Sequence, residues 1–441
     1  MQQRLISLAF RNVRVNWRHS LSALLSVVAA FYSIVFFEGY IRDVGDLYYD
    51  GYHSRNMFGD FVVENAKAQT PEGRAEPFQF AVTAPEQKAL KEFKQKHSDI
   101  VEESARFLNL QGMVTNGKTS VIFFGKALDV EEGRRIREPD WGWNALYGKP
   151  LHLVSNPNSV LVGQILGRSL SCHPVKVVQV MSPDKGYIAE ERPFECDSPQ
   201  VQLSVTTESG QLNAMDFDIA GFIDGGYQEI DNRYMAIPLP AAQQLMNTDK
   251  VSYVTFLLKD QKYRDQFEKS FAEEIEKSFP DLRLTRWQDH PVGELYRKSI
   301  DLLSVFRNFV VIVIISITTL SVANTKIKSI KERTKEIGTL RSIGFMPASI
   351  RSIFMWESFF LSAFGVIIGA VAAIVTTFLV NHAGIYYKAG LLSMPVPFHI
   401  KAELWVYALA AVVLVVIGLI VTAIVCRGTL KKKIVENLGH V

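Results

Sequence analysis

Four long apolar runs constrain this chain more than any other feature of its sequence. A helix needs about 20 apolar residues to cross the hydrocarbon core of a bilayer. The runs reach that length and predict membrane-spanning segments at residues 21–41, 301–324, 352–380 and 403–426. A secretory signal peptide is the alternative for the first run. The sequence FFEGYIRD after it shows no small-residue cleavage site, which favours an uncleaved anchor.

Basic residues lie at alternate ends of these runs and predict how the chain is oriented. Residues 1–20 carry four arginines and no acid, residues 325–351 carry seven Lys or Arg, and residues 427–441 form a basic tail. Short loops rich in Lys and Arg stay on the cytoplasmic side of a membrane. We therefore expect both termini and the 325–351 loop inside the cell, with residues 42–300 and 381–402 outside.

The first 20 residues also have the pattern of an amphipathic helix. Arg4, Arg11 and Arg18 recur every seven residues and share one helical face. The apolar stripe beside them consists of Leu5, Ala9, Val13 and Trp17. This pattern fits a helix lying in the inner membrane interface. A basic leader that only sets orientation is the alternative.

Residues 42–300 contain no run of membrane-spanning length and predict a large domain of mixed α+β structure. Their β-branched and aromatic content predicts strands at 60–64, 120–124, 175–180, 201–205 and 252–258. Apolar periodicity predicts helices at 85–96 and 261–279. Residues 181–200, rich in Pro, Asp and Glu, predict a surface hairpin, which is either a plain loop or a contact arm for a partner.

The 325–351 loop carries the sequence KIKSIKERTKEIGTLRSIG and predicts a helix, since good helix formers run without proline until Pro347. Apolar spacing puts Ile330, Ile337, Leu340 and Gly344 on one side of that helix, and Glu332 and Glu336 on another. Such a helix could dock on a protein partner. A solvated linker whose lysines meet anionic lipid is the alternative.

Two further features concern packing and covalent structure. Gly365 and Gly369 are four residues apart in the third span and predict a face for close helix packing. Cys172 and Cys196 lie in the segment expected outside the cell, where either a disulfide or two free thiols fits the sequence. Cys426 lies at a predicted membrane boundary and reads as apolar filling.

The sequence gives no sign of catalytic chemistry. It contains no GxxxxGK[ST] phosphate loop, no HExxH and no GxSxG, and its nine histidines form no ligand-spaced pair. The three cysteines have no metal-site spacing, and a net charge of +3 gives no argument for nucleic-acid binding. We expect a non-catalytic chain with no metal and no cofactor of its own.

The loop also carries a specific resemblance to a known family. Glu332–Gly338, then Leu340 and Arg341, then Ile343 and Gly344, resemble the signature loop of the MacB/FtsX-like ABC transporter permeases, a superfamily that includes the lipoprotein-releasing LolC and LolE permeases. Further patches resemble the family's periplasmic core at residues 160–170, 217–223 and 233–238. Glu357, Gly365 and Gly369 match the family's pattern in the third span. The tail at 433–438 resembles the family's basic tail but lacks its usual proline.

The resemblance implies a fold and a site. The implied fold class is α+β: a four-transmembrane-helix permease with a large mixed α/β periplasmic domain inserted between helices 1 and 2. In the family, the loop forms a coupling helix that seats on an ATPase subunit. The residues that the resemblance assigns to this contact are Glu332, Arg333, Glu336, Ile337, Gly338, Leu340, Arg341 and Gly344.

The resemblance also implies function, partners and location. The expected role is mechanotransmission: a separate ABC ATPase dimer holds the ATP and Mg²⁺, and its closure drives the external domain to extract or release a lipoprotein or another amphiphile. The expected partners are that ATPase, a second permease copy or paralogue, membrane lipid and a periplasmic carrier or adaptor. The expected location is the bacterial inner membrane. A MacB-like tripartite exporter and an FtsX-like signal transducer that activates a periplasmic hydrolase are the alternatives.

Overall fold

The computed structural model of the chain divides into two compact units. It describes residues 2–15, 17–175, 191–225, 228–387 and 395–430. The first unit comprises Met1–Gly45, Ile300–Ile385 and Phe398–Val441, and the second comprises Asp46–Ser299 and Tyr386–Pro397. We call them the helical unit and the inserted domain. The inserted domain interrupts the helical unit after its first long helix, as the sequence predicted.

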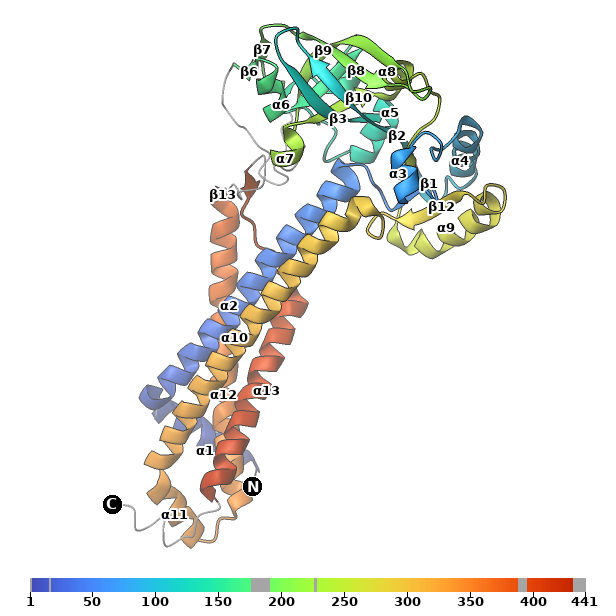
Figure 1. Cartoon of the computed structure of the whole chain (residues 1–441). Coiled ribbons are helices and arrows are strands. Elements are labelled where there is room, and N and C mark those ends of the chain that lie inside the picture. The colour runs from blue at the N-terminus through green and yellow to red at the C-terminus, as the bar shows by residue number, and fades with distance from the viewer. Residues whose placement is uncertain (1, 16, 176–190, 226–227, 388–394, 431–441) are drawn as a thin grey trace. The chain divides into compact units, whose positions relative to one another are not determined.

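Long helices build the helical unit (Figure 1). Their bounds are α1 Gln2–Val15, α2 Trp17–Asp50, α10 Glu294–Glu332, α11 Thr334–Ser342, α12 Pro347–His382 and α13 Leu404–Leu430. Within the described residues, four helices, α2, α10, α12 and α13, are long and apolar enough to cross a membrane, which matches the predicted spans. Helices α2 and α10 extend well beyond the apolar runs. In α10 the flanking residues are rich in Glu, Lys and Arg, which are good helix formers.

Close contacts hold these helices together. A Cβ at Gly365 would lie 2.7 Å from Val27 Cγ1, and one at Gly369 would lie 3.0 Å from the Val28 carbonyl oxygen. The predicted packing face of α12 is therefore confirmed, and α2 of the same chain occupies it. On another side of α12, Ser358 Oγ donates to the Gly418 carbonyl oxygen of α13 at 3.0 Å.

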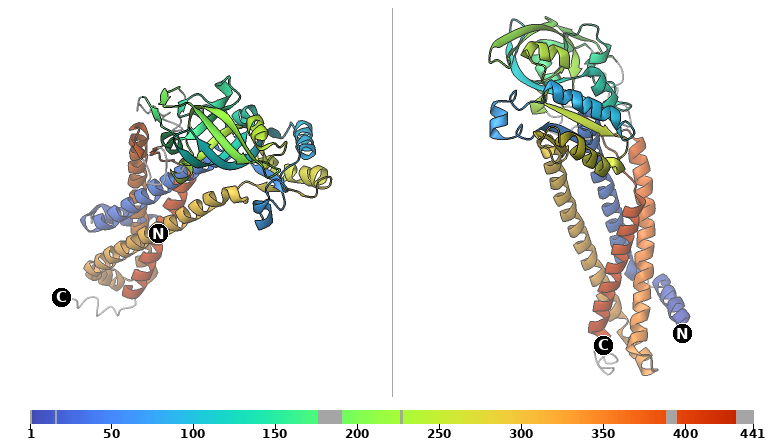
Figure 2. Two further views of the ribbon diagram at one scale, coloured as in Figure 1. Left: turned by 45° about the horizontal axis from the view of Figure 1, so that its top comes forward. Right: turned by 90° about the vertical axis from the view of Figure 1, so that its right-hand side faces the viewer.

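A charged residue of α10 and the amphipathic helix α1 also make contacts within the helical unit. Arg307 of α10 lies 3.6 Å from Glu38 of α2. Helix α1 lies beside α12 (Figure 2). Ala9 and Ile353 are buried together there, and the Phe10 and Phe360 rings are 5.5 Å apart. The apolar side of α1 thus contacts a neighbouring helix of the chain.

The inserted domain is a mixed α/β structure built on one large sheet. The strands of this sheet are β1 Phe61–Asn65, β2 Val101–Thr115, β3 Ser120–Leu128, β4 Tyr147–Gly148, β5 Ser159–Gly163, β8 Gln200–Thr206, β9 Leu212–Ile223, β10 Tyr234–Pro238, β11 Tyr253–Leu258 and β12 Leu282–Arg286. Two separate pairs are β6 Cys172–Pro174 with β7 Phe194–Cys196, and β13 Tyr386–Tyr387 with β14 Val396–Pro397.

Short helices connect these strands. The α-helices are α3 Pro71–Ala75, α4 Ala84–Lys96, α5 Val130–Arg137, α6 Gln164–Ser169, α7 Gln228–Asp231, α8 Leu239–Met246 and α9 Arg264–Phe271. The 3₁₀ and π turns are η1 Gly51–Arg55, η2 Leu151–Leu153, η3 Gln261–Tyr263, η4 Ala272–Glu276 and η5 Pro291–Gly293.

The large sheet closes on itself through one strand. Its order is β12-β1-β11-β2-β3-β10-β5-β9-β4, and β8 pairs with both β2 and β9. Strands β2, β3, β10, β5, β9 and β8 therefore form a closed ring, while β1, β11 and β12 extend from it beside β2. Phe123, Leu203 and Phe217, one from each of three ring strands, belong to one buried core. The same core continues to the β1 and β11 extension, where Phe61 stacks on Phe267 of α9 at 5.0 Å.

Most predicted elements of this domain are confirmed, with informative exceptions. Strand β2 was not predicted, although its residues alternate between buried and exposed positions as an amphipathic strand should. The single helix predicted at 261–279 is wrong in detail, since the structure divides that stretch into η3, α9 and η4. The predicted strand at 175–180 lies, apart from residue 175, outside the described residues, as do the first half of the predicted hairpin at 181–200 and the tail at 433–438.

Candidate functional site

The charged loop forms a helical elbow between α10 and α12. The prediction of one helix through this loop is wrong at one point: α10 ends at Glu332, Arg333 has φ −99° and ψ 16°, and α11 begins at Thr334. The hydroxyl of Thr334 donates to the carbonyl oxygens of Ile330 and Lys331, at 3.2 and 2.7 Å. Such side-chain bonds compete with the regular helical pattern and bend helices.

A glycine cap ends α11. Gly344 has φ +97°, its N–H donates to the Arg341 carbonyl oxygen, and the Phe345 N–H donates to the Leu340 carbonyl oxygen. These two bonds with a left-handed glycine define a Schellman motif. The expectation that Gly344 shares the apolar stripe is wrong: it is exposed and turns the chain out of the helix.

The apolar stripe of the loop faces the chain itself. Ile330 is 1% exposed and Ile337 is 3% exposed. They form one cluster with Ile350 and Phe354 of α12 and Cys426 of α13, and Leu340 packs on its edge. The third and fourth long helices already cover Ile337, so this residue of the assigned contact has little free surface for a partner, whereas Leu340 is half-buried. Gly338 is buried as well.

An ionic cluster fixes the elbow to α12. Arg333 Nη1 donates to the two carboxylate oxygens of Glu357 at 2.8 and 3.1 Å, and Asn12 of α1 donates to the same carboxylate at 2.8 Å. The Arg333 and Glu357 side chains are 16% and 7% exposed. Arg333 Nε also donates to Glu336 at 2.9 Å. Arg333 is thus bound within the chain, and Glu357 pairs with it, as the sequence allowed.

The opposite side of the elbow is exposed and chemically mixed. Glu332, Lys335 and Glu336 are exposed there, and Arg341 is half-buried. Beyond α11, Ile343 is 71% exposed and Met346 is 72% exposed. Sequence reasoning did not predict that these two apolar side chains would be exposed. The sequence signal that could have found them is two apolar residues on either side of Gly344 that do not belong to the buried stripe of Ile330 and Ile337.

The remaining candidate residues concern covalent structure and metals. Cys172 of β6 and Cys196 of β7 are joined in a disulfide, which selects one of the two alternatives left open by the sequence. Cys426 is buried in the elbow cluster, as expected of apolar filling. Across the ranges that the structure describes, no group of three or more His, Cys, Asp or Glu side chains is placed to hold a metal ion.

Comparisons with known proteins bear on this same part of the chain. Residues 308–434 match the family model described as FtsX-like permease C-terminal, and this range includes the elbow. The ABC transporter permease YtrF of Bacillus subtilis is 35% identical over 75 residues, which is 17% of each chain. The lipoprotein-releasing system transmembrane protein LolC of Xylella fastidiosa is 23% identical over 184 residues, covering 41% of this chain and 43% of that protein.

A solved structure gives a more distant likeness. The periplasmic region of MacB from Actinobacillus actinomycetemcomitans aligns with 55% of this chain and 92% of its own, at a TM-score of 0.33 and 11% identity. This likeness is too weak to carry an argument. The chain spans less than half the length of the two curated relatives above. Residues 308–434, which hold the elbow between two apolar helices, are thus similar to the C-terminal part of FtsX-like permeases, and the chain resembles ABC transporter permeases over part of its length.

Proposed function

We propose that this chain is the permease subunit of an ABC transporter and that the elbow receives motion from a separate ATPase. The observation that carries the proposal is the two-sidedness of α11. Ile343 and Met346, just after α11, are exposed, as is Glu336 of α11, while the other side is fixed to α12 by Arg333 and Glu357. Exposed apolar side chains together with charged ones have the chemistry of a protein contact. A push on the exposed side would pass directly into α12.

Helix α10 supports a mechanical role. It runs without a break from Glu294, within the inserted domain, to Glu332 at the elbow. A helix of its 39 residues is about 58 Å long at 1.5 Å per residue. We propose that the helix transmits motion from the elbow to the inserted domain. ATP and Mg²⁺ would bind the partner ATPase, and this chain would bind neither.

The proposal includes a setting and a cargo. The four spans would lie in a bacterial inner membrane with both termini in the cytoplasm and the inserted domain in the periplasm, in agreement with the Lys and Arg distribution. A second permease, identical or related, would complete the membrane part. The similarity to a lipoprotein-releasing protein supports a lipoprotein or another amphiphile as cargo, taken up by a periplasmic carrier or adaptor.

Co-purification tests the ATPase contact. The tagged full chain is isolated in mild detergent from its own host, and the bound proteins are identified by mass spectrometry. We expect an ATPase with a phosphate-binding loop, which Ile343→Glu combined with Met346→Glu should remove. Leu153→Glu is the matched control, since Leu153 is a 52% exposed apolar residue of the inserted domain. An ATPase that stays bound to the double variant, or no ATPase with the parent chain, would contradict the proposal.

The same preparation separates the candidate roles. Bound lipoprotein would support the releasing transporter. An outer-membrane duct with its adaptor would instead indicate an exporter. A cell-wall hydrolase without lipid cargo would indicate a signal transducer.

A further inference from the structure

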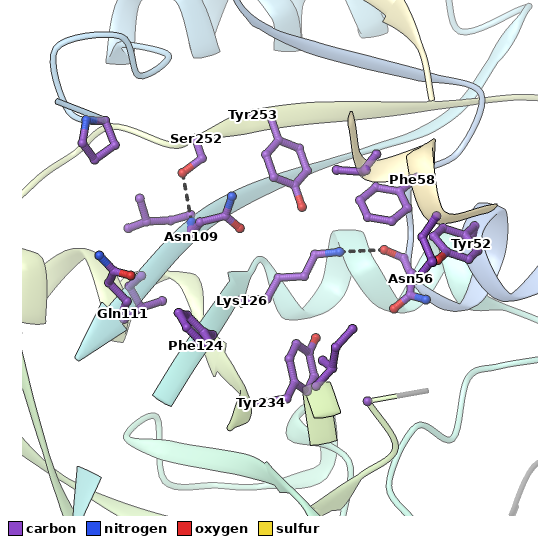
Figure 3. Close-up of a pocket in the computed structure, with 18 of the residues that line it drawn as sticks. Tyr52, Asn56, Phe58, Asn109, Gln111, Phe124, Lys126, Tyr234, Ser252 and Tyr253 are labelled. Atoms are coloured by element: carbon purple, nitrogen blue, oxygen red, sulfur yellow. Dashed lines mark hydrogen bonds between the residues drawn. The ribbon is translucent and has the colours of Figure 1, made fainter. Parts of the chain in front are cut away.

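A large groove lies within the inserted domain. Its volume is about 1260 Å³, and all of its lining residues belong to that domain. Ring strands β2, β3 and β10 contribute Leu110, Phe124 and Tyr234, and Tyr52 and Phe58 come from η1 and the chain just after it (Figure 3). Ligand sites are typically mostly apolar hollows of about 300–1,000 Å³ with a few polar groups. The groove is large enough for an extended apolar chain.

Lys126 of β3 is the unusual residue of this groove. It is 9% exposed, and its ammonium donates to the Asn56 carbonyl oxygen at 2.8 Å. The ammonium also lies over the rings of Phe58 and Phe107, at 4.3 and 4.4 Å from their centroids. Among the described residues, no carboxylate lies within ion-pair distance of it. A buried ammonium without an anion is costly, and an apolar residue of similar size would avoid that cost.

Two tyrosines line the same groove as Lys126. In Figure 3, the hydroxyls of Tyr234 and Tyr253 are turned toward the Lys126 side chain from opposite sides. Burial raises the pKa of Tyr234 to about 12 and the pKa of Tyr253 well above 10, so both remain protonated donors near neutral pH. One ammonium and two phenol groups thus line one groove as hydrogen-bond donors, and such donors are the chemistry that holds an anion.

We propose that this groove binds a single-chain amphiphile with an anionic head group, such as a long-chain fatty acid or a lysophospholipid. The head-group oxygens would accept hydrogen bonds from the ammonium of Lys126 and from the hydroxyls of Tyr234 and Tyr253. The acyl chain would lie along Phe124 and Leu110. Charge complementarity selects this occupant: the polar end of the groove offers an unneutralised cation and proton donors, and its walls are apolar and aromatic.

Photo-labelling of the full chain tests this inference. The protein is held in amphipol without nucleotide and labelled with a diazirine analogue of palmitate, and mass spectrometry locates the adducts. We expect adducts on β2 or β3 that palmitate displaces and hexadecanol, with the same chain and no charge, does not. Exposed apolar residues of α10 such as Leu302 and Val305 supply an internal reference for unspecific labelling. Palmitate and lysophosphatidic acid as competitors distinguish a carboxylate from a phosphate head group.

Matched variants locate the binding energy. Lys126→Met should lower groove labelling about tenfold or more, the range of a charge-assisted hydrogen bond. Phe124→Glu should also lower the labelling of the groove. The fold should tolerate this substitution, because Phe124 is 48% exposed. Lys118→Met removes an exposed lysine that directly precedes β3 and should leave labelling unchanged. Equal displacement by hexadecanol, full labelling of a folded Lys126→Met variant, or adducts confined to α10 would overturn the inference.

The outcome is separable from the coupling proposal. Labelling is measured without ATP and without an ATPase, so a failure of the elbow contact leaves the groove result standing. A groove that takes no acyl chain likewise leaves the elbow proposal untouched.

Discussion

Arg333 and Glu357, 24 residues apart in the chain, form a two-point ion pair between the elbow and α12. The pair is enclosed, since both side chains are largely buried. Removing one partner of such a pair leaves the other charge buried without compensation, which costs far more than an exposed pair contributes. The pair therefore fixes how α11 sits on α12.

Glu357→Ala should loosen the elbow. We expect a loss of about 3 kcal/mol in the local stability of α11, because the Arg333 guanidinium loses its enclosed anion. Trypsin should then cut faster after Lys335, which is exposed on α11. Limited proteolysis of the purified chain measures this rate. Glu336→Gln is the control, since it removes only the exposed partner of Arg333 and should cost under about 1 kcal/mol. Equal cleavage rates in both variants would refute the assignment.

The two sides of α11 should separate stability from coupling. Ile337→Ala should cost about 2–5 kcal/mol, because it empties a site buried against α12 and α13. Glu336→Lys should leave stability and membrane insertion nearly unchanged but abolish stimulation of the partner ATPase. Thermal unfolding and ATPase rates of the reconstituted pair measure both effects. Normal stimulation with Glu336→Lys would remove the elbow from the proposed contact.

The sequence predicted those parts of the fold that depend on local pattern. Hydropathy is local, and the described residues form a long apolar helix at each of the four predicted spans. The spacing of Gly365 and Gly369 likewise marked a packing face. The surface that covers an apolar stripe of a helix cannot be predicted from the local sequence of that helix. Ile330 and Ile337 form a stripe that suits a partner or the chain equally well, and only the fold shows that α12 and α13 take it.

The groove could not be predicted for the same reason. Lys126, Tyr234 and Tyr253 lie on strands far apart in the chain. Parallel pairing of β3 with β10 and antiparallel pairing of β11 with β2 bring them together. The sequence around Lys126, FFGKALDV, reads as an ordinary strand, and burial of its lysine depends on residues distant in sequence.

Matched glycine substitutions test the close approach of α2 and α12. Gly365→Ala should destabilise the chain by about 1–3 kcal/mol, because its Cβ would lie 2.7 Å from Val27 Cγ1 in a packed interface. Gly45→Ala in α2 makes the same change where the nearest atom is 3.9 Å away. It should be neutral or stabilising by up to about 1 kcal/mol, since alanine favours helix. Thermal unfolding of both variants in one detergent measures the contrast, and effects of equal sign would contradict it.

Lys126→Met should stabilise the inserted domain, and most strongly at low pH. Burial, together with the nearby Arg137, lowers the pKa of Lys126 from 10.5 to about 7. Above pH 7 the unfolded chain holds a proton that the folded chain has released, so the free energy of unfolding of the parent chain rises with pH. The slope approaches about 1.4 kcal/mol per pH unit from this group alone. The methionine variant lacks this contribution.

Arg137, Tyr234 and Tyr253 near Lys126 do not titrate between pH 6 and 9. Burial lowers the pKa of Arg137 to about 10 and raises the pKa of Tyr234 to about 12, with that of Tyr253 also well above 10. Between pH 6 and 9, Lys126 is therefore the one member of this set that titrates. The thermal midpoints of parent and variant are measured at pH 6 and at pH 9. The difference between the two proteins should be larger at pH 6, by about 2–4 °C for each kcal/mol of difference in unfolding free energy. A gap that does not shrink as pH rises would show that Lys126 carries no buried charge, and would remove the cation on which anion binding in the groove depends.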